Sequence, residues 1–283
     1  MIVGTTMGGG PQALNLGLYP LASATTGMVN YNYTEMSSAT TASLTGDFNA
    51  GTACGTTSTA YFCLGDGTTA TNTTPYSAVG PIAGPVALYD VGTSGYMGAA
   101  TGNLAQMFVG VGADVTSSIN WTYSGNSQSA GPAFPAAEEN MVSAGTGGAG
   151  YFVGVSPVDF YEFSYSGQAF TAGPALTTND PNACGNLSVG VFNDGGGAAT
   201  VVLTYSGFTS AAGGNFTSSS TESGGAAGNA TLGLFALGDG ASTTNGYTFS
   251  NNSVAATNSL ASAYSSTIPK AKACAACTPS AAA

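Results

Sequence analysis

The sequence predicts an all-β fold built from six copies of one unit, on two observations. An aromatic residue followed by Ser or Thr recurs at intervals of 43, 47, 42, 40 and 44 residues along the 283-residue chain. Gly, Ala, Ser, Thr and Asn dominate the composition, and no stretch has a convincing 3.6-residue apolar period. So regular an interval predicts one supersecondary unit that is copied and stacked. The copies of the signature are Tyr33-Thr34, Tyr76-Ser77, Tyr123-Ser124, Tyr165-Ser166, Tyr205-Ser206 and Phe249-Ser250.

Two further short motifs recur at nearly constant distances from this signature. A step of small residues that ends in Gly precedes a short apolar run upstream of most copies. Its examples are Ala53-Cys54-Gly55, Thr101-Gly102, Ala144-Gly145, Cys184-Gly185 and Ala227-Gly228. An Ala-Gly-Pro step follows downstream, at Ala83-Gly84-Pro85, Ala130-Gly131-Pro132, Ala172-Gly173-Pro174 and, degraded, at Ala212-Gly213-Gly214.

Each unit divides into four short strands. In the third copy we expect them near residues 99–103, 107–111, 119–123 and 127–134. The first strand carries little side-chain bulk, which suits the crowded axis of a radial array, and the aromatic residues of later strands would fill the widening wedges. Four strands in about 43 residues are typical of a propeller blade.

The fold class predicted is therefore a six-bladed β-propeller over residues 1–268, followed by a C-terminal tail over residues 269–283. An open solenoid is the alternative. Solenoids need polar caps at their ends. Residues 1–22 instead already contain the first two strands of a unit, which favours a closed ring.

The charges exclude several classes of function. The chain has 13 acidic residues, two Lys, no Arg and no His. Neutralising nucleic-acid phosphates or anionic membrane surfaces requires cations, so the sequence predicts neither partner. It contains no apolar run long enough for a transmembrane helix. Residues 1–4 lack the basic stretch and the longer apolar segment of a secretory signal, so we expect either that the chain does not use that route or that a signal has been removed.

The order of small residues with Gly, apolar strand, Tyr-Ser-Gly and Ala-Gly-Pro resembles the kelch-like propeller repeats of tailed-bacteriophage virion proteins. The likeness covers nearly the whole chain except the tail, and it is clearest in copies three to six, notably over residues 226–235 and 247–254. The resemblance implies a propeller displayed on a virion, assembled in the host cytoplasm and exposed on the particle surface.

The composition offers few combinations of side chains that could form a catalytic site. Without His the usual Ser and Cys triads cannot form, so the sequence predicts no enzyme and no cofactor. A glycoside hydrolase or lyase needs only two carboxylates and stays open as a minor alternative. Glu138-Glu139 is the only adjacent acidic pair, in the link after a fourth strand, where it is expected to be solvated.

Acidic residues also recur after the second strand of four units, at Asp66, Asp114, Asp194 and Asp239. We interpret them first as turn residues on one face of the disc, since Asp-Gly is favoured in tight turns. The alternative is calcium bound within single blades, because carboxylates spread around a ring could not share one ion. Exposed aromatic residues such as Tyr89, Tyr96 and Tyr264 could stack on sugars, whereas Trp121 is expected in the core at the site filled by Tyr31, Tyr161 and Tyr247.

The five cysteines do not form a disulfide scaffold in a chain of this length. Buried free thiols are expected for Cys54, Cys63 and Cys184, with a Cys54–Cys63 cross-strand disulfide as the alternative. Cys274 and Cys277 could form a local or an intermolecular disulfide. A zinc site there is disfavoured, because a structural site needs four ligands and the chain offers no His.

Together these observations predict a non-enzymatic virion structural protein, either a tail fibre or appendage or a head or neck decoration module. Its tail would anchor it to other virion proteins through Lys270, Lys272, Cys274 and Cys277, and loop faces would contact host-surface polysaccharide. A cellular sugar-binding lectin or adhesin is the main alternative.

Overall fold

A computed structural model describes about three fifths of the chain. The described residues are 4–5, 16–20, 27–33, 35–41, 43–45, 52–55, 59–63, 71–75, 82–83, 99–103, 105–110, 116–137, 141–154, 159–174, 176, 182–193, 197–219, 225–229, 231–236, 242–259 and 274–275. They contain strands and one 3-10 turn, Tyr205–Gly207, and no α-helix. The predicted all-β class is confirmed.

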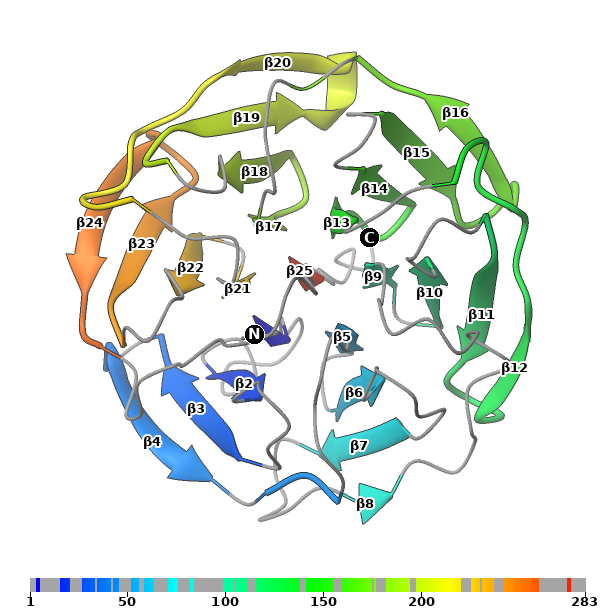
Figure 1. Cartoon of the computed structure of the whole chain (residues 1–283), viewed down its shortest axis with the longest axis horizontal. Coiled ribbons are helices and arrows are strands. Elements are labelled where there is room, and N and C mark those ends of the chain that lie inside the picture. The colour runs from blue at the N-terminus through cyan, green and yellow to red at the C-terminus, as the bar shows by residue number, and fades with distance from the viewer. Residues whose placement is uncertain are drawn as a thin grey trace, which may run out of the picture.

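The described strands form six sheets, numbered here in chain order (Figure 1). Sheet 1 contains β1 (Gly4–Thr5), β2 (Leu16–Pro20), β3 (Met28–Asn32), β4 (Ser37–Thr41) and, beside β1, β25 (Cys274–Ala275). Sheet 2 contains β5 (Thr52–Gly55), β6 (Thr59–Cys63), β7 (Thr71–Pro75) and β8 (Ile82–Ala83). Sheet 3 contains β9 (Ala100–Gly102), β10 (Gln106–Gly110), β11 (Ser118–Thr122) and β12 (Ser127–Ala130).

The remaining three sheets repeat the same order. Sheet 4 contains β13 (Val142–Gly145), β14 (Ala149–Val153), β15 (Phe160–Ser164) and β16 (Ala169–Ala172). Sheet 5 contains β17 (Ala183–Gly185), β18 (Val189–Asn193), β19 (Thr200–Thr204) and β20 (Thr209–Ala212). Sheet 6 contains β21 (Gly225–Gly228), β22 (Leu232–Ala236), β23 (Thr244–Thr248) and β24 (Ser253–Thr257).

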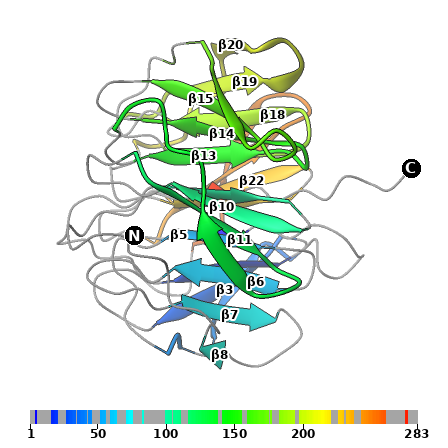
Figure 2. The same ribbon diagram turned by 90° about the vertical axis from the view of Figure 1, so that its right-hand side faces the viewer.

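The six sheets lie around a common centre, each with its first strand on the inner side and its fourth strand outermost, and in sheet 1 β25 lies inside β1 (Figure 1). Consecutive first strands contact one another from β1 through β5, β9, β13 and β17 to β21, and β21 contacts β1 again. In the perpendicular view, most strands run along the short axis of the molecule (Figure 2). All neighbouring strands within a sheet are antiparallel except β1 and β25, which are parallel.

The first strands are buried because the surrounding sheets converge on them. All residues of β9, β13 and β17 are buried, and their side chains are small. Where the sheets diverge, aromatic side chains fill the space. Phe108 of β10 stacks on Phe163 of β15 with ring centroids 3.8 Å apart, and it meets Phe152 edge-on at 5.6 Å.

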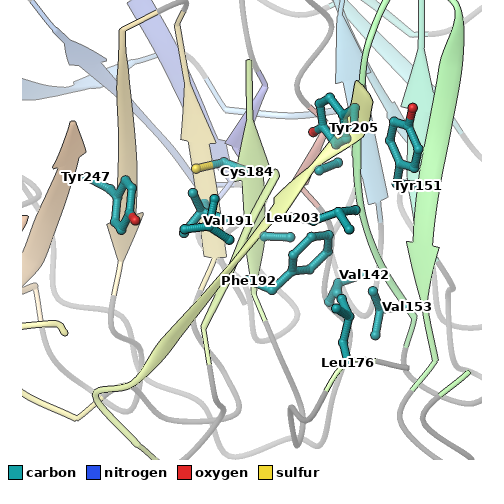
Figure 3. Packing of buried hydrophobic residues seen from close by; sticks show 14 of the residues in the cluster. Val142, Tyr151, Val153, Leu176, Cys184, Val191, Phe192, Leu203, Tyr205 and Tyr247 are labelled. Atoms are coloured by element: carbon teal, nitrogen blue, oxygen red, sulfur yellow. The ribbon is translucent and has the colours of Figure 1, made fainter. Parts of the chain in front are cut away.

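A second core cluster spans sheets 4, 5 and 6 (Figure 3). It uses a different mixture of residues, with aliphatic Val191 and Leu203 beside the aromatic Tyr205 and Tyr247. Tyr151 and Tyr205, from neighbouring sheets, stack with an interplanar angle of 4° and a centroid distance of 4.2 Å. Burial of such rings contributes a large share of the stability of a small-residue fold.

Two equivalent hydrogen-bonded links join neighbouring sheets. Asn72 of β7 accepts bonds from the backbone N–H and the hydroxyl of Thr45, which follows the last strand of sheet 1, at 2.9 and 2.8 Å. Asn245 of β23 accepts the same two bonds from Thr217, which follows the last strand of sheet 5, at 2.9 and 2.8 Å. In both cases the segment that follows the last strand of one sheet is hydrogen-bonded to the third strand of the next sheet.

The aromatic-Ser/Thr signature marks the hairpin between the third and fourth strands. Three residues after the aromatic residue, the backbone adopts positive φ angles of 44° to 54°, although none of these residues is Gly. The residues in this conformation are Met36, Asn126, Gln168, Phe208 and Asn252. Every described non-Gly residue with positive φ therefore lies at one repeat position, so the turn geometry belongs to the repeat.

The structure corrects two expectations for the third unit and confirms one. The fourth strand of the third unit ends at Ala130 and not at residue 134, although Gly131 and Phe134 still donate backbone bonds to Ser118 and Thr116. Trp121 is fully buried as expected. Trp121 pairs with Met107. Gly150 holds the position of Met107 in sheet 4, and it pairs with Phe163. The residue equivalent to Trp121 in sheet 4 is therefore Phe163 and not Tyr161.

The alternative Cys54–Cys63 disulfide is wrong, as is the expectation of a free thiol at Cys54. Cys54 pairs across the ladder with Tyr61, whereas Cys63 pairs with Thr52. Cys63 is a free, buried thiol, and Cys54 is disulfide-bonded. The sequence placed the two cysteines on adjacent strands but did not fix the register between them.

Candidate functional site

Near the centre, two of the signature tyrosines, Tyr123 and Tyr165, reach across to the first strand of the preceding sheet. The Tyr165 hydroxyl donates to Thr101 Oγ1 at 3.0 Å, and the Tyr123 hydroxyl donates to Cys54 Sγ at 3.6 Å. Thr101 and Cys54 hold equivalent positions, one residue before the Gly that ends the small-residue step. The signature is therefore explained by contacts between sheets, which a repeat unit cannot make alone.

Glycines leave the room for these contacts. A Cβ on Gly150 would collide with the Thr101 side chain of the preceding sheet, and one on Gly233 would collide with Cys184 Sγ. A Cβ on Gly102 would lie 2.7 Å from the Tyr123 hydroxyl and 2.8 Å from Cys54 Sγ. The centre is thus closely packed at these positions.

The described ionisable side chains are scattered and locally bonded. Tyr161 donates to Asp159 at 3.1 Å, Tyr151 to Glu162 at 3.5 Å, and Ser37 to Glu35 at 3.3 Å. Burial, with a smaller effect of Glu162, raises the pKa of Tyr151. Among the described residues, no three His, Cys, Asp or Glu side chains come together as a metal site would require.

The free thiols are also poorly placed for chemistry. Burial raises the pKa of Cys63 to about 12, so its reactive thiolate form is scarce at neutral pH. Cys184 is fully buried and free. Neither thiol has the exposed, electropositive surroundings of a nucleophilic cysteine.

The outer strands form the clearest described surface. We use "outer belt" for the described side chains of β4, β12, β16, β20 and β24, the last strands of five sheets. Their residues are Ser, Thr, Ala, Gln, Phe and Val, without a charged side chain. All four residues of β20 are exposed, and three of the four in β12 and in β16. The belt offers neutral hydroxyl groups in a repeated arrangement.

Most predicted site residues lie outside the described part of the chain. This applies to Asp66, Asp114, Asp194 and Asp239, to Lys270, Lys272 and Cys277, to Glu138 and Glu139, and to Tyr89, Tyr96 and Tyr264. The strands that precede the four Asp residues, β6, β10, β18 and β22, are each the second strand of a sheet, as expected. Whether any Asp binds calcium stays a prediction.

Cys274 is the exception among the predicted tail residues. With Ala275 it forms β25, which pairs with β1 in the register Gly4 with Cys274 and Thr5 with Ala275. β25 contacts all six first strands and so lies at the centre of the ring (Figure 1). Nothing in the sequence of the tail, which lacks the apolar run of the other units, pointed to this pairing.

Neither a family model nor a curated protein sequence matches this chain. Among the described residues, no helix has the length and apolar character needed to cross a membrane.

Proposed function

We propose that the chain is a six-bladed β-propeller in which sheets 1 to 6 are the blades. Support comes from the identical strand order of the sheets and from the contacts that return from β21 to β1. A closed ring removes the free ends at which an open stack of repeats would need polar caps.

The same proposal assigns the protein a non-enzymatic, structural role on the surface of a tailed-phage virion, as a tail fibre or appendage or as a head or neck decoration module. The virion assignment depends on the resemblance of the repeats. The observation that carries the display role is the outer belt, a neutral and hydroxyl-rich surface repeated on five blades. Neutral hydroxyls can bond to glycan or backbone groups without a desolvated charge.

Binding measurements distinguish a tail fibre or appendage module from a head or neck decoration module. A fibre or appendage module is expected to bind host cells or purified surface polysaccharide, and a decoration module to bind empty heads instead. The variant Thr209→Glu with Ala211→Glu puts two charges on the exposed β20 and should weaken whichever contact the belt makes. Wild-type protein that binds none of these targets would contradict the display role.

Attachment to other virion proteins is assigned to the tail, residues 269–283. A chain that ends at Thr267 should fail to join particles. Because this deletion also removes β25, the matched variant Lys270→Ser with Lys272→Ser keeps the strand and removes only the two cations. If both altered proteins are incorporated normally, the tail is not the anchor.

The lectin and the enzyme remain testable alternatives. Trp121 is fully buried, so the only Trp of the chain does not offer a stacking surface for a sugar ring. Incubation with host polysaccharide, followed by size-exclusion analysis of the polymer, tests hydrolysis or lysis. We expect an unchanged chain length, and depolymerisation would overturn the non-enzymatic role.

A further inference from the structure

The disulfide of Cys54 has a restricted choice of partners. The chain contains five cysteines, and Cys63 and Cys184 are free thiols. Cys54 is disulfide-bonded. Within one chain the remaining cysteines are Cys274 and Cys277, both near the C-terminal end of the sequence.

The backbone brings these two parts of the sequence together independently of the cysteines. β25, which begins at Cys274, pairs in parallel with β1 and contacts β5, the strand that carries Cys54. A disulfide requires Cα atoms within about 7 Å of each other. Contact between β5 and β25 brings the two strands close together in space, whereas the sequence separates Cys54 from the tail by most of the chain.

We propose that Cys54 is covalently joined to Cys274 or Cys277, so that a disulfide and the pairing of β25 with β1 together hold β25 at the centre of the six sheets. The segment is thereby tied to two different sheets, through β1 to sheet 1 and through Cys54 to sheet 2.

Cys184 shows that the position alone does not cause oxidation. It occupies the same place in sheet 5 that Cys54 occupies in sheet 2, one residue before the terminal Gly of the first strand, and both side chains are fully buried. Yet Cys184 is free and Cys54 is bonded. On this proposal the tail thiol reaches Cys54 and not Cys184, although β25 contacts the strands of both, so Cys184 serves as the control.

The bond forms by thiol–disulfide exchange with a low-molecular-weight disulfide. One thiolate of the protein attacks this oxidant and releases one small thiol. The second protein thiolate then attacks the mixed disulfide and releases another. Two protein thiols thus lose two electrons and two protons to the small disulfide, which leaves as two thiols. Backbone pairing of β25 requires no oxidant, so the segment can dock first and be locked when the protein meets an oxidising environment.

Peptide mapping of the full chain tests the link directly. The protein is purified in reducing buffer, oxidised with glutathione disulfide, alkylated, digested and analysed by mass spectrometry. We expect a cross-linked peptide pair containing Cys54 and either Cys274 or Cys277. A Cys274–Cys277 link, a disulfide between two chains, or alkylated Cys54 in the oxidised protein would overturn the proposal.

Thermal unfolding provides a second measurement that does not depend on one variant folding. A disulfide that closes a loop of roughly 200 residues should raise the melting temperature by roughly 5–15 °C in oxidised protein. Cys54→Ala and the double variant Cys274→Ser with Cys277→Ser should both lose this redox difference. Cys184→Ala should keep it, and loss of the difference in Cys184→Ala alone would contradict the assignment.

Discussion

The inner strands and the outer belt of this protein are made from similar residues in opposite environments. β13 and β20 are both four residues long and rich in small side chains, but every residue of β13 is buried and every residue of β20 is exposed. At the centre a small side chain allows a neighbouring sheet to approach. At the rim it leaves the surface neutral and open.

This difference indicates where the sequence is constrained. Near the centre, one added methyl group meets a side chain of the neighbouring sheet, as at Gly150 and Gly233. On the belt, the same addition meets solvent. The effect of a substitution on stability should therefore depend more on its distance from the centre of the six sheets than on the type of residue replaced.

The largest expected effect is alkaline unfolding, which acts on the inner layers alone. Burial raises the pKa of Cys63 from 9.0 to about 12 and also raises the pKa of Tyr61, Tyr151 and Tyr165. The folded state holds these protons more tightly than the unfolded chain. This share of the stability is thus complete below the unfolded pKa values and is lost as the pH rises through the folded ones.

Melting temperatures measured from pH 8 to pH 12 test this prediction, with a steep fall expected above about pH 9. Cys63→Ala should flatten part of the fall, because it removes one buried proton. A melting temperature that stayed constant up to pH 12 would contradict the burial of these groups.

Next in size is the loss of an inner aromatic ring. Phe108 is fully buried and contacts Phe134, Phe152, Phe163 and Phe170. Phe108→Ala should lower the free energy of unfolding by about 3–5 kcal/mol in urea titrations. The control Ser129→Ala on the exposed belt should change it by less than about 0.5 kcal/mol. Similar values for the two variants would remove the distinction between centre and rim.

A smaller effect should reveal the contact between two sheets. Gly150→Ala should cost about 1–3 kcal/mol because the new methyl group collides with Thr101. Thr101→Ser removes the obstructing methyl group and keeps the hydroxyl that accepts the bond from Tyr165. In the double variant the two costs should be less than additive, with a coupling of about 1 kcal/mol. Simple additivity would mean that the two residues do not meet.

The smallest effect belongs to the exposed hairpins. Asn126 has a φ of 44° and is exposed. Asn126→Gly should change the free energy of unfolding by no more than about 0.5 kcal/mol, in the stabilising direction, while Asn126→Val should destabilise by about 1–2 kcal/mol. Equal stability of the two variants would show that the positive φ is not required in solution.

Much of the fold could be predicted from the repeat. The four strands of the third unit were expected within about one residue of their observed ends, except at the end of the fourth strand. The prediction succeeded because small residues, apolar runs and turn residues recur in phase, and six weak signals in one register add up to a strong one.

Other features depend on contacts between distant parts of the sequence. The alternation of buried and exposed residues does not reveal whether Cys54 lies opposite Tyr61 or Cys63, since a shift in register changes the partner without changing the strand. The links from Thr45 to Asn72 and from Thr217 to Asn245 likewise join separate sheets. No local pattern encodes either pairing.

By itself, the sequence determined the number of units, the strands within each unit and the shortage of catalytic side chains, since these depend on periodicity and composition. Only the tertiary structure decided that Tyr123 and Tyr165 bond to the preceding sheet, that β25 lies at the centre and that Cys54 is oxidised. The physical reason is that a contact between residues far apart in sequence forms only when the chain closes on itself, and its geometry depends on every unit in between.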